Sequence, residues 1–191
     1  MRRFLAMVCL LVSCCGVGRG AEPKERFAFI DLQGKTNQTL NETFSPNFPE
    51  CHLAELPQGE QKLGAAPFKI GPGCICLGSK VVEDKPDKVE IPVNRKLAKL
   101  FMLHGTQNGG APDPHPTHVK DGTLIGQYLV RYADGSAEGI EIAYGEDVRD
   151  WWNWDKSKET KRGKVAWTGT NPAAKMYDLD LRLFESSWTN P

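Results

Sequence analysis

The segment Thr123–Gly145, TLIGQYLVRYADGSAEGIEIAYG, constrains the fold more than any other part of this chain. It contains two runs of alternating apolar and polar residues, joined by a turn that holds Asp134 and Gly135. An Asp-Gly pair readily adopts the positive φ angles of a tight turn, so the segment predicts a β-hairpin. Tyr128 and Val130 share one face of the first arm, because side chains alternate along a strand.

The rest of the chain alternates short β-rich runs with turns, and no long segment shows a helical period. Leu97–His104 carries one charge before its final histidine, which predicts a central strand covered on both faces. Further strands are expected at Arg26–Leu32, Val89–Val93 and Gly163–Thr170, and two more within Ala66–Ser79.

A half-buried strand is expected at the C-terminal end of the chain, with one apolar face and one solvated face. The apolar face holds Leu179, Leu181 and Leu183, and the solvated face holds Asp178, Asp180 and Arg182. Many short strands within the length of one domain predict an all-β fold, specifically a β-sandwich of the jelly-roll type.

The N-terminus predicts a signal peptide over residues 1–21, which leaves residues 22–191 as a single domain. Arg2 and Arg3 precede an apolar run that is too short to span a bilayer. Two cleavage sites compete. Leu11–Cys14 resembles the lipobox of bacterial lipoproteins, in which Cys14 would be lipidated, and Gly18–Ala21 suits an ordinary signal peptidase. We therefore expect the protein in the periplasm, at the cell envelope or outside the cell, with membrane contact only through a lipid anchor.

The charge balance argues against a nucleic-acid partner. The chain carries 24 Lys and Arg against 24 Asp and Glu, and loss of the leader removes three arginines and no acid. A nucleic-acid binder would show a clustered basic excess. Beyond the leader, Cys51 is expected either to pair with Cys74 or Cys76 in one disulfide or to remain a buried thiol.

The stretch DVRDWWNWD, Asp147–Asp155, holds three of the five tryptophans. One interpretation is a sugar platform, in which Trp151, Trp152 and Trp154 offer aromatic faces while Asn153 and Asp155 bind hydroxyl groups. The alternative is core packing. We expect a division, with either Trp151 or Trp152 buried and the other lying near the surface with Trp154.

The charged residues of the same stretch have two interpretations. Arg149 is expected to fix the loop through a carboxylate, because its planar guanidinium suits bidentate pairing. Glu146, Asp147, Asp150 and Asp155 could hold a structural calcium ion, but hydrogen bonding within the loop, for example between Asp150 and Arg149 or backbone amides, is favoured. Arg149 and Asp150 are also candidate ligand-binding residues.

Three histidines are the remaining candidates for a metal or acid–base centre: His104 at the end of the central strand, and His115 and His118 in a Pro-rich loop. Loop histidines spaced by prolines are more often surface residues. No nucleophile elbow, phosphate loop or zinc-protease motif is present in the sequence, so we expect a non-enzymatic protein, with a hydrolase as the least favoured alternative.

Several stretches together resemble a family of exported β-sandwich domains found in planctomycete-type bacteria. They are IDLQGKTNQ, LAELPQGEQKLGAAPFKIG, CLGSK, KLAKLFMLHGT, IGQYLVRYADGS, IEIAYGEDVRDWW, VAWTGTNPAAK and LRLFESSWTNP. The resemblance implies a galactose-binding-like jelly roll, in which a structural calcium is common, and it implies no enzymatic activity.

Two departures from this family stand out. The segment GTQNGGAPDPHPTH replaces an aromatic region, and the chain stops at Pro191, where relatives continue into another strand. A missing strand would leave an unpaired sheet edge unless another segment covers it. The function expected is a binding module with a glycan or envelope polymer as ligand. The alternative is a structural, sensor-type or interaction protein that docks a partner through a sheet edge or the tryptophan loop.

Overall fold

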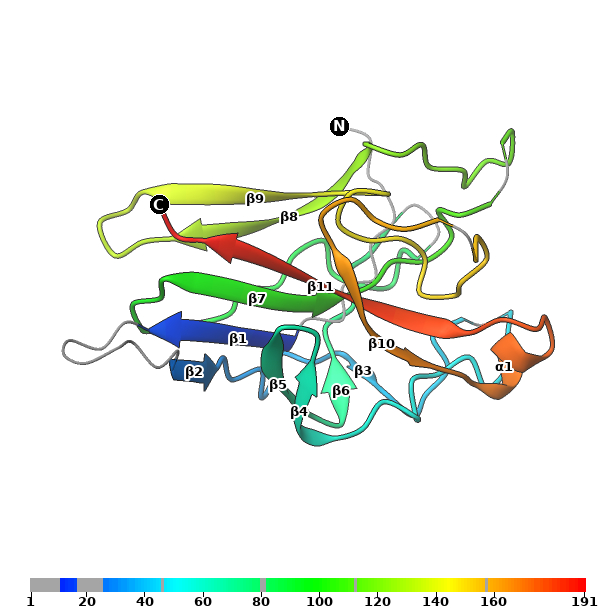
Figure 1. Ribbon diagram of the computed structural model, residues 1–191, viewed down its shortest axis with the longest axis horizontal. Helices are drawn as coiled ribbons and strands as arrows, with labels where there is room; N and C mark the ends of the chain where they lie inside the picture. The colour runs from blue at the N-terminus through cyan, green and yellow to red at the C-terminus, as the bar shows by residue number, and fades with distance from the viewer. Residues whose placement is uncertain (1–10, 17–25, 46, 80–81, 112, 157) are drawn as a thin grey trace.

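The computed structural model describes residues 11–16, 26–45, 47–79, 82–111, 113–156 and 158–191 (Figure 1). Within these ranges the fold is all-β, as predicted, and the one helix, α1 (Pro172–Lys175), has four residues. None of the helices described is long and apolar enough to cross a membrane. The strands are β1 (Leu11–Gly16), β2 (Arg26–Phe29), β3 (Gln38–Thr39), β4 (Gly59–Leu63), β5 (Ala66–Ile70), β6 (Gly73–Cys74), β7 (Lys99–His104), β8 (Leu124–Arg131), β9 (Ala137–Ala143), β10 (Lys164–Gly169) and β11 (Leu181–Thr189).

A five-stranded antiparallel sheet with the order β10-β11-β7-β1-β2 forms the centre of the molecule. The prediction of a central strand is confirmed, since β7 pairs with β1 on one side and with β11 on the other. Leu100 and Met102 of β7 face one hydrophobic cluster, whereas Phe101 and Leu103 face another. This alternation explains why β7 reads as an almost continuous apolar run.

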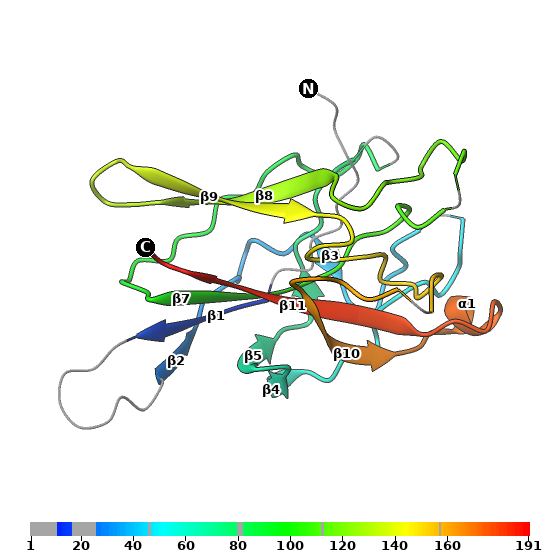
Figure 2. The same ribbon diagram turned by 45° about the horizontal axis from the view of Figure 1, so that its top comes forward.

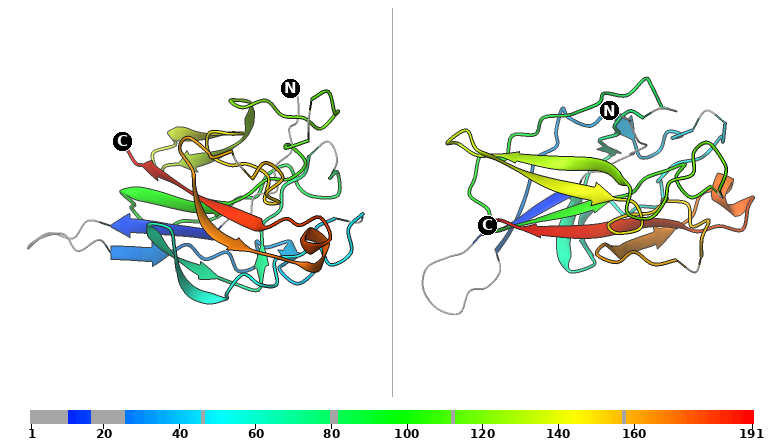
Figure 3. Two further views of the ribbon diagram at one scale, coloured as in Figure 1. Left: turned by 45° about the vertical axis from the view of Figure 1, so that its right-hand side comes forward. Right: turned by 90° about the horizontal axis from the view of Figure 1, so that it is seen from above.

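Smaller two-stranded sheets cover the two faces of the central sheet (Figure 2). The β4–β5 pair packs beneath it, where Phe68 joins the cluster that holds Phe101. The β8–β9 hairpin lies over the opposite face, where Tyr128 packs against the cluster that holds Met102 (Figure 3). The hairpin predicted from the Asp-Gly turn is confirmed: β8 and β9 pair in register, and Gly135 has φ +89°.

The β5 and β6 strands flank the predicted turn at Gly71–Gly73, but they do not pair with each other. Strand β5 pairs with β4, a polar segment that the sequence did not predict as a strand. The strand predicted at Val89–Val93 is wrong, because that segment is irregular and only packs its apolar side chains against the β7 cluster. These differences arise because non-local pairing decides which short segments become strands.

The prediction of a solvated face on the last strand is wrong at Arg182. Asp178 and Asp180 are exposed, but Arg182 is 5% exposed. It lies on the same side of β11 as Phe184, which packs in the cluster under β8 and β9. A buried arginine at this position requires buried partners, and the tryptophan-rich segment supplies them, as described below.

The first and the last of the described strands, β1 and β11, both belong to the central sheet. The part of the predicted leader that the structure describes forms β1, in which Cys14 is in register with Leu100 and Ala28; the rest of residues 1–21 lies outside the described residues. The last strand, β11, pairs with β10 and with β7, so the expected unpaired edge does not fall on β11. The edges of this sheet are β10 and β2.

Candidate functional site

The tryptophan-rich segment lies in the space between the diverging ends of β7 and β11. Trp151 N donates to Thr106 O at 2.7 Å, and Arg182 N donates to Trp151 O at 2.7 Å. An isolated bridge joins Trp152 to Leu181. The segment therefore continues the sheet between two separated strands, which fixes the positions of all three tryptophans.

Trp151 and Trp152 are both buried, at 1% and 4% exposure, which corrects the expectation that one of them lies near the surface. The chain bends at Trp151, so strict alternation is lost, and a loop covers both rings. Phe44 of that loop packs on Trp151 and Phe48 packs on Trp152, each with ring centroids 5.3 Å apart.

Trp154 is the exposed member of the segment, as expected, with 46% of its surface accessible. Its ring stacks on buried Trp152, with centroids 5.4 Å apart and planes at 27°. Tyr177, which follows α1 and is 47% exposed, leans against Trp154 with centroids 5.7 Å apart and planes at 59°. Met176, at 80% exposure, precedes Tyr177. Trp154 and Tyr177 form an exposed aromatic platform.

A shallow cleft borders this platform and encloses about 330 Å³, part of it open to solvent. The aromatic residues that line it are Phe48, Trp151, Trp152 and Trp154, and the other lining residues are Ser45, Cys51, Gln107, Asn108 and Asp150. Aromatic walls with a few polar groups are typical of small-ligand sites.

The indole nitrogen of Trp152 is the polar group at this cleft that lacks a strong partner. Among the residues that the structure describes, no oxygen or nitrogen accepts a hydrogen bond from Nε1. Its neighbour is the thiol of Cys51, a weak acceptor. Burial raises the pKa of that thiol to about 11, and the indole N–H lowers it in part. An indole N–H with only a sulfur partner can still bind a better acceptor.

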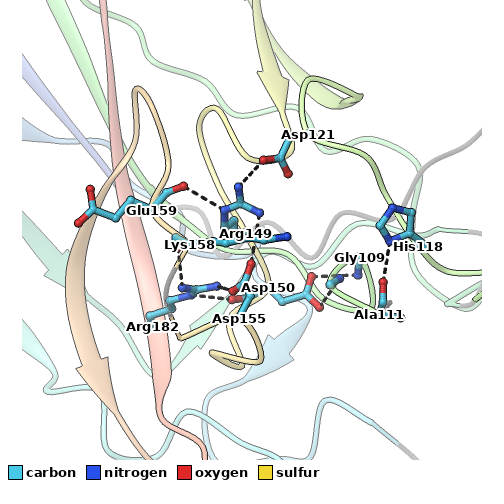
Figure 4. Close-up of polar contacts among 11 residues, drawn as sticks. Gly109, Ala111, His118, Asp121, Arg149, Asp150, Asp155, Lys158, Glu159 and Arg182 are labelled. Atoms are coloured by element: carbon cyan, nitrogen blue, oxygen red, sulfur yellow. Dashed lines mark hydrogen bonds and ion pairs between the residues drawn. The ribbon is translucent and has the colours of Figure 1, made fainter. Parts of the chain in front are cut away.

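Asp150 closes the inner end of the cleft. It is 2% exposed, and its two carboxylate oxygens accept hydrogen bonds from Gly109 N and Gly110 N, each at 2.9 Å (Figure 4). Burial raises the pKa of Asp150 to about 6, although the two amides oppose this shift. The carboxylate fixes the loop that carries Gln107 and Asn108, in agreement with the predicted bonding to backbone amides.

Arg149 and Arg182 converge on one carboxylate, that of Asp155. Arg149 Nη1 lies 3.2 Å from Asp155 Oδ2, and Arg182 Nη2 lies 2.5 Å from Oδ1 (Figure 4). Arg149 also donates to Asp121 Oδ2 at 2.5 Å. The prediction that Arg149 ties the loop through a carboxylate is confirmed, and Asp121 and Arg182 are partners that the sequence did not reveal.

The remaining acids of the segment are also paired. Asp147 accepts two hydrogen bonds from Arg162, at 2.9 and 2.6 Å, and Glu146 accepts one from Lys161 at 2.6 Å. Each acid proposed for calcium is thus bonded to arginine, lysine or backbone N–H, as the favoured alternative predicts. Within the described ranges, no group of three His, Cys, Asp or Glu side chains could hold a metal ion.

The three candidate histidines have separate environments. His104 is 1% exposed; its Nδ1 lies 3.0 Å from Tyr128 Oη and its Nε2 lies 2.9 Å from Ser186 Oγ. Burial lowers the pKa of His104 to about 4. His115 is exposed beside Thr117, and His118 Nδ1 lies 2.6 Å from Ala111 O. His104 therefore joins the hairpin to the sheet and does not face solvent.

The thiols of Cys51, Cys74 and Cys76 are buried and form no disulfide. The Sγ atoms of Cys74 and Cys76 lie 3.8 Å apart. Cys51 lies instead beside Trp152, at the cleft. Of the two alternatives left open by the sequence, the structure therefore shows the buried thiols.

No protein-family model, curated protein or solved structure matches this chain. The site is therefore described by its own geometry. Sequence reasoning identified the three tryptophans but missed Phe48, Tyr177, Gln107 and Asn108, which come from three other segments. The one available signal was the aromatic residue of the AAKMYD stretch, which follows a helix-capping Asn-Pro pair.

Proposed function

We propose that this protein is a non-catalytic binding module of the bacterial cell envelope, and that the platform of Trp154 and Tyr177 binds carbohydrate. The observation that carries the proposal is an indole ring that is 46% exposed and held rigidly by a buried partner. Aromatic faces stack on the apolar faces of sugar rings, and a ring fixed in advance loses little entropy on binding.

The polar groups around the platform suit hydroxyl-rich ligands. Gln107, Asn108 and Ser45 line the cleft and offer both donors and acceptors without net charge. We extend the proposal to the fold type, a galactose-binding-like jelly roll of the exported family that the sequence resembles. We also propose residues 1–21 as an export signal, with Cys14 as the lipidation site if the lipobox is used.

The test is titration calorimetry against a panel of soluble polysaccharides and oligosaccharides, with the wild-type protein, Trp154→Ala and a matched control. Leu129→Ala is a suitable control, because Leu129 is 48% exposed on β8, over the opposite face of the central sheet. We expect Trp154→Ala to lose binding while it keeps its fold, and Leu129→Ala to bind as wild type. Absence of binding to every glycan would rule the proposal out.

A second candidate function is protein docking through the same platform. Met176, which precedes Tyr177 in the chain, is 80% exposed, and exposed aromatic residues such as Trp154 and Tyr177 are typical binding hot spots. A protein partner whose binding is not inhibited by any sugar, and is lost in Met176→Ala, would favour this alternative. Docking at the last strand has less support, since β11 pairs with strands on both sides.

A further inference from the structure

The ring geometry of the platform limits the shape of the ligand that it can take. Trp154 stacks on Trp152 at 5.4 Å and 27°, so one of its two faces is covered. Tyr177 lies 5.7 Å from Trp154, with its plane tilted by 59°. Only the outer face of Trp154 is left for a ligand ring.

A sugar ring cannot enter between Trp154 and Tyr177. Carbon atoms in contact lie about 3.5–4.0 Å apart, so a ring held between two others needs at least about 7 Å between their centres. The observed 5.7 Å and 5.4 Å separations both fall short of this. The aromatic residues therefore do not form a clamp that closes on both faces of a ring.

A flat surface cannot lie on both exposed rings at once. Because their planes meet at 59°, a rigid sheet of parallel sugar chains that lies on Trp154 cannot also lie face to face with Tyr177. Binding to a crystalline polysaccharide gains from several coplanar contacts, which this tilt prevents. Tyr177 instead presents an edge or a hydroxyl group beside a ring that is stacked on Trp154.

The charges next to the platform are compensated. Lys156 pairs with Asp178 at 3.0 Å, and Asp155 is bonded to two arginines. Asp150 is buried and accepts two amide hydrogen bonds. Apart from exposed Lys175, two residues before Tyr177, these charged neighbours are paired and attract an acidic sugar or a phosphate only weakly, so an uncharged ring suits the site best.

We propose that the site binds one uncharged pyranose ring of a soluble glycan, stacked on the outer face of Trp154 with its polar edge toward the cleft. This inference rests on the proposed function and narrows it. Gln107 and Asn108, which line the cleft, are the groups that face the polar edge, directly or through water held in the cleft. The occupied length is that of one or two sugar units.

The experiment compares soluble and crystalline ligands of the same chemistry. The full chain is titrated with glucose and N-acetylglucosamine oligomers of increasing length, and it is also sedimented with crystalline cellulose and crystalline chitin. We expect binding to the soluble oligomers, an affinity that stops rising after the first one or two units, and no depletion by the crystals. Trp154→Ala should weaken binding at least about tenfold, and Leu129→Ala should leave it unchanged.

The outcomes separate the two proposals. Binding to the crystals, or an affinity that keeps rising with chain length, would overturn this inference while leaving carbohydrate binding in place. Failure to bind any soluble or crystalline probe would overturn the proposed function itself. Equal binding by wild type and Trp154→Ala would place the sugar elsewhere and overturn the inference.

Discussion

Nε2 of His104 and Oγ of Ser186 lie 2.9 Å apart inside the contact between the central sheet and the β8–β9 hairpin. Nδ1 of the same ring lies 3.0 Å from the hydroxyl of Tyr128 on the hairpin. One buried imidazole therefore joins β7, β11 and β8. Both ring nitrogens have hydroxyl partners, and a hydroxyl group can donate as well as accept, so the neutral ring is fully satisfied.

The first prediction concerns pH. Burial lowers the pKa of His104 to about 4 from an ordinary value of 6.5, so between these values the unfolded state binds more protons. The contribution of His104 to the free energy of unfolding is fully present above pH 6.5. It falls by about 1.4 kcal/mol per pH unit as the pH drops from 6.5 toward 4. The free energy of unfolding of wild type relative to His104→Gln, measured in urea, should fall accordingly.

The comparison with His104→Gln is needed because Asp150 acts in the opposite direction. Burial raises its pKa to about 6, so its contribution grows as the pH falls through the same range. Both proteins carry Asp150, and its effect cancels in the difference. A difference that stays constant between pH 7 and pH 5 would contradict the assigned role of His104.

The second prediction separates the tryptophans by stability. Trp151→Ala should cost about 3–5 kcal/mol, because a large side chain that is 1% exposed leaves a cavity. Trp154→Ala should cost about 1 kcal/mol, the scale of one stacking contact on a half-exposed ring. Chemical denaturation of both variants measures the two losses in unfolding free energy. Equal losses would show that Trp154 belongs to the core.

The third prediction concerns the shared carboxylate. Asp155→Asn leaves two arginines, 4% and 5% exposed, without the charge between them, so we expect a loss of about 3 kcal/mol of stability. Asp178→Asn is the matched control, because its partner Lys156 is exposed and the pair should contribute nothing measurable. Thermal unfolding of both variants checks the contrast; similar melting temperatures would refute it.

The fourth prediction concerns the thiols. Burial raises the pKa of Cys51 to about 11, and the hydrogen bond with Cys74 together with burial raises the pKa of Cys76 well above its ordinary value, so both thiols are protonated and shielded at neutral pH. We expect iodoacetamide to label Cys51, Cys74 and Cys76 slowly in the native protein and rapidly in urea. Mass spectrometry resolves each position. Fast labelling of Cys51 in the native protein would mean that the cleft opens far enough to expose this thiol to solvent.

The fifth prediction concerns β1. A chain that lacks residues 1–21 loses the strand between β7 and β2, so both should expose unpaired backbone groups. If residues 1–21 are cleaved as an export signal, this truncated form is the mature protein and should be a stable monomer. Association or a loss of stability would instead show that β1 belongs to the mature fold, because open edges favour strand addition. Light scattering and urea denaturation of the two forms provide the measurement. A monomer of unchanged stability would show that β1 is dispensable.

The hairpin and the central strand could be predicted because their signals are local. An Asp-Gly turn between alternating arms needs no information from elsewhere in the chain. An almost uncharged run such as Leu97–Leu103 indicates burial on both faces by its composition alone. The all-β class followed from these local patterns.

The site could be predicted only in part, because it depends on distant partners. Arg182 appeared solvent-facing in the sequence until the structure placed Asp155 beside it. Trp152 is buried because Phe48 covers it, and Trp154 gains Tyr177 from the other end of the chain. Such contacts join segments that no local periodicity connects.

The stack of Trp152 on Trp154 also gives the protein a built-in optical reporter. One indole of the pair is 4% exposed and the other is 46% exposed, so the fluorescence of Trp154 responds to solvent while that of Trp152 responds little. Because the two rings touch, their electronic transitions couple and should give a paired band in circular dichroism. A ligand on the outer face of Trp154 would shift its emission to shorter wavelength, so binding can be followed without a label.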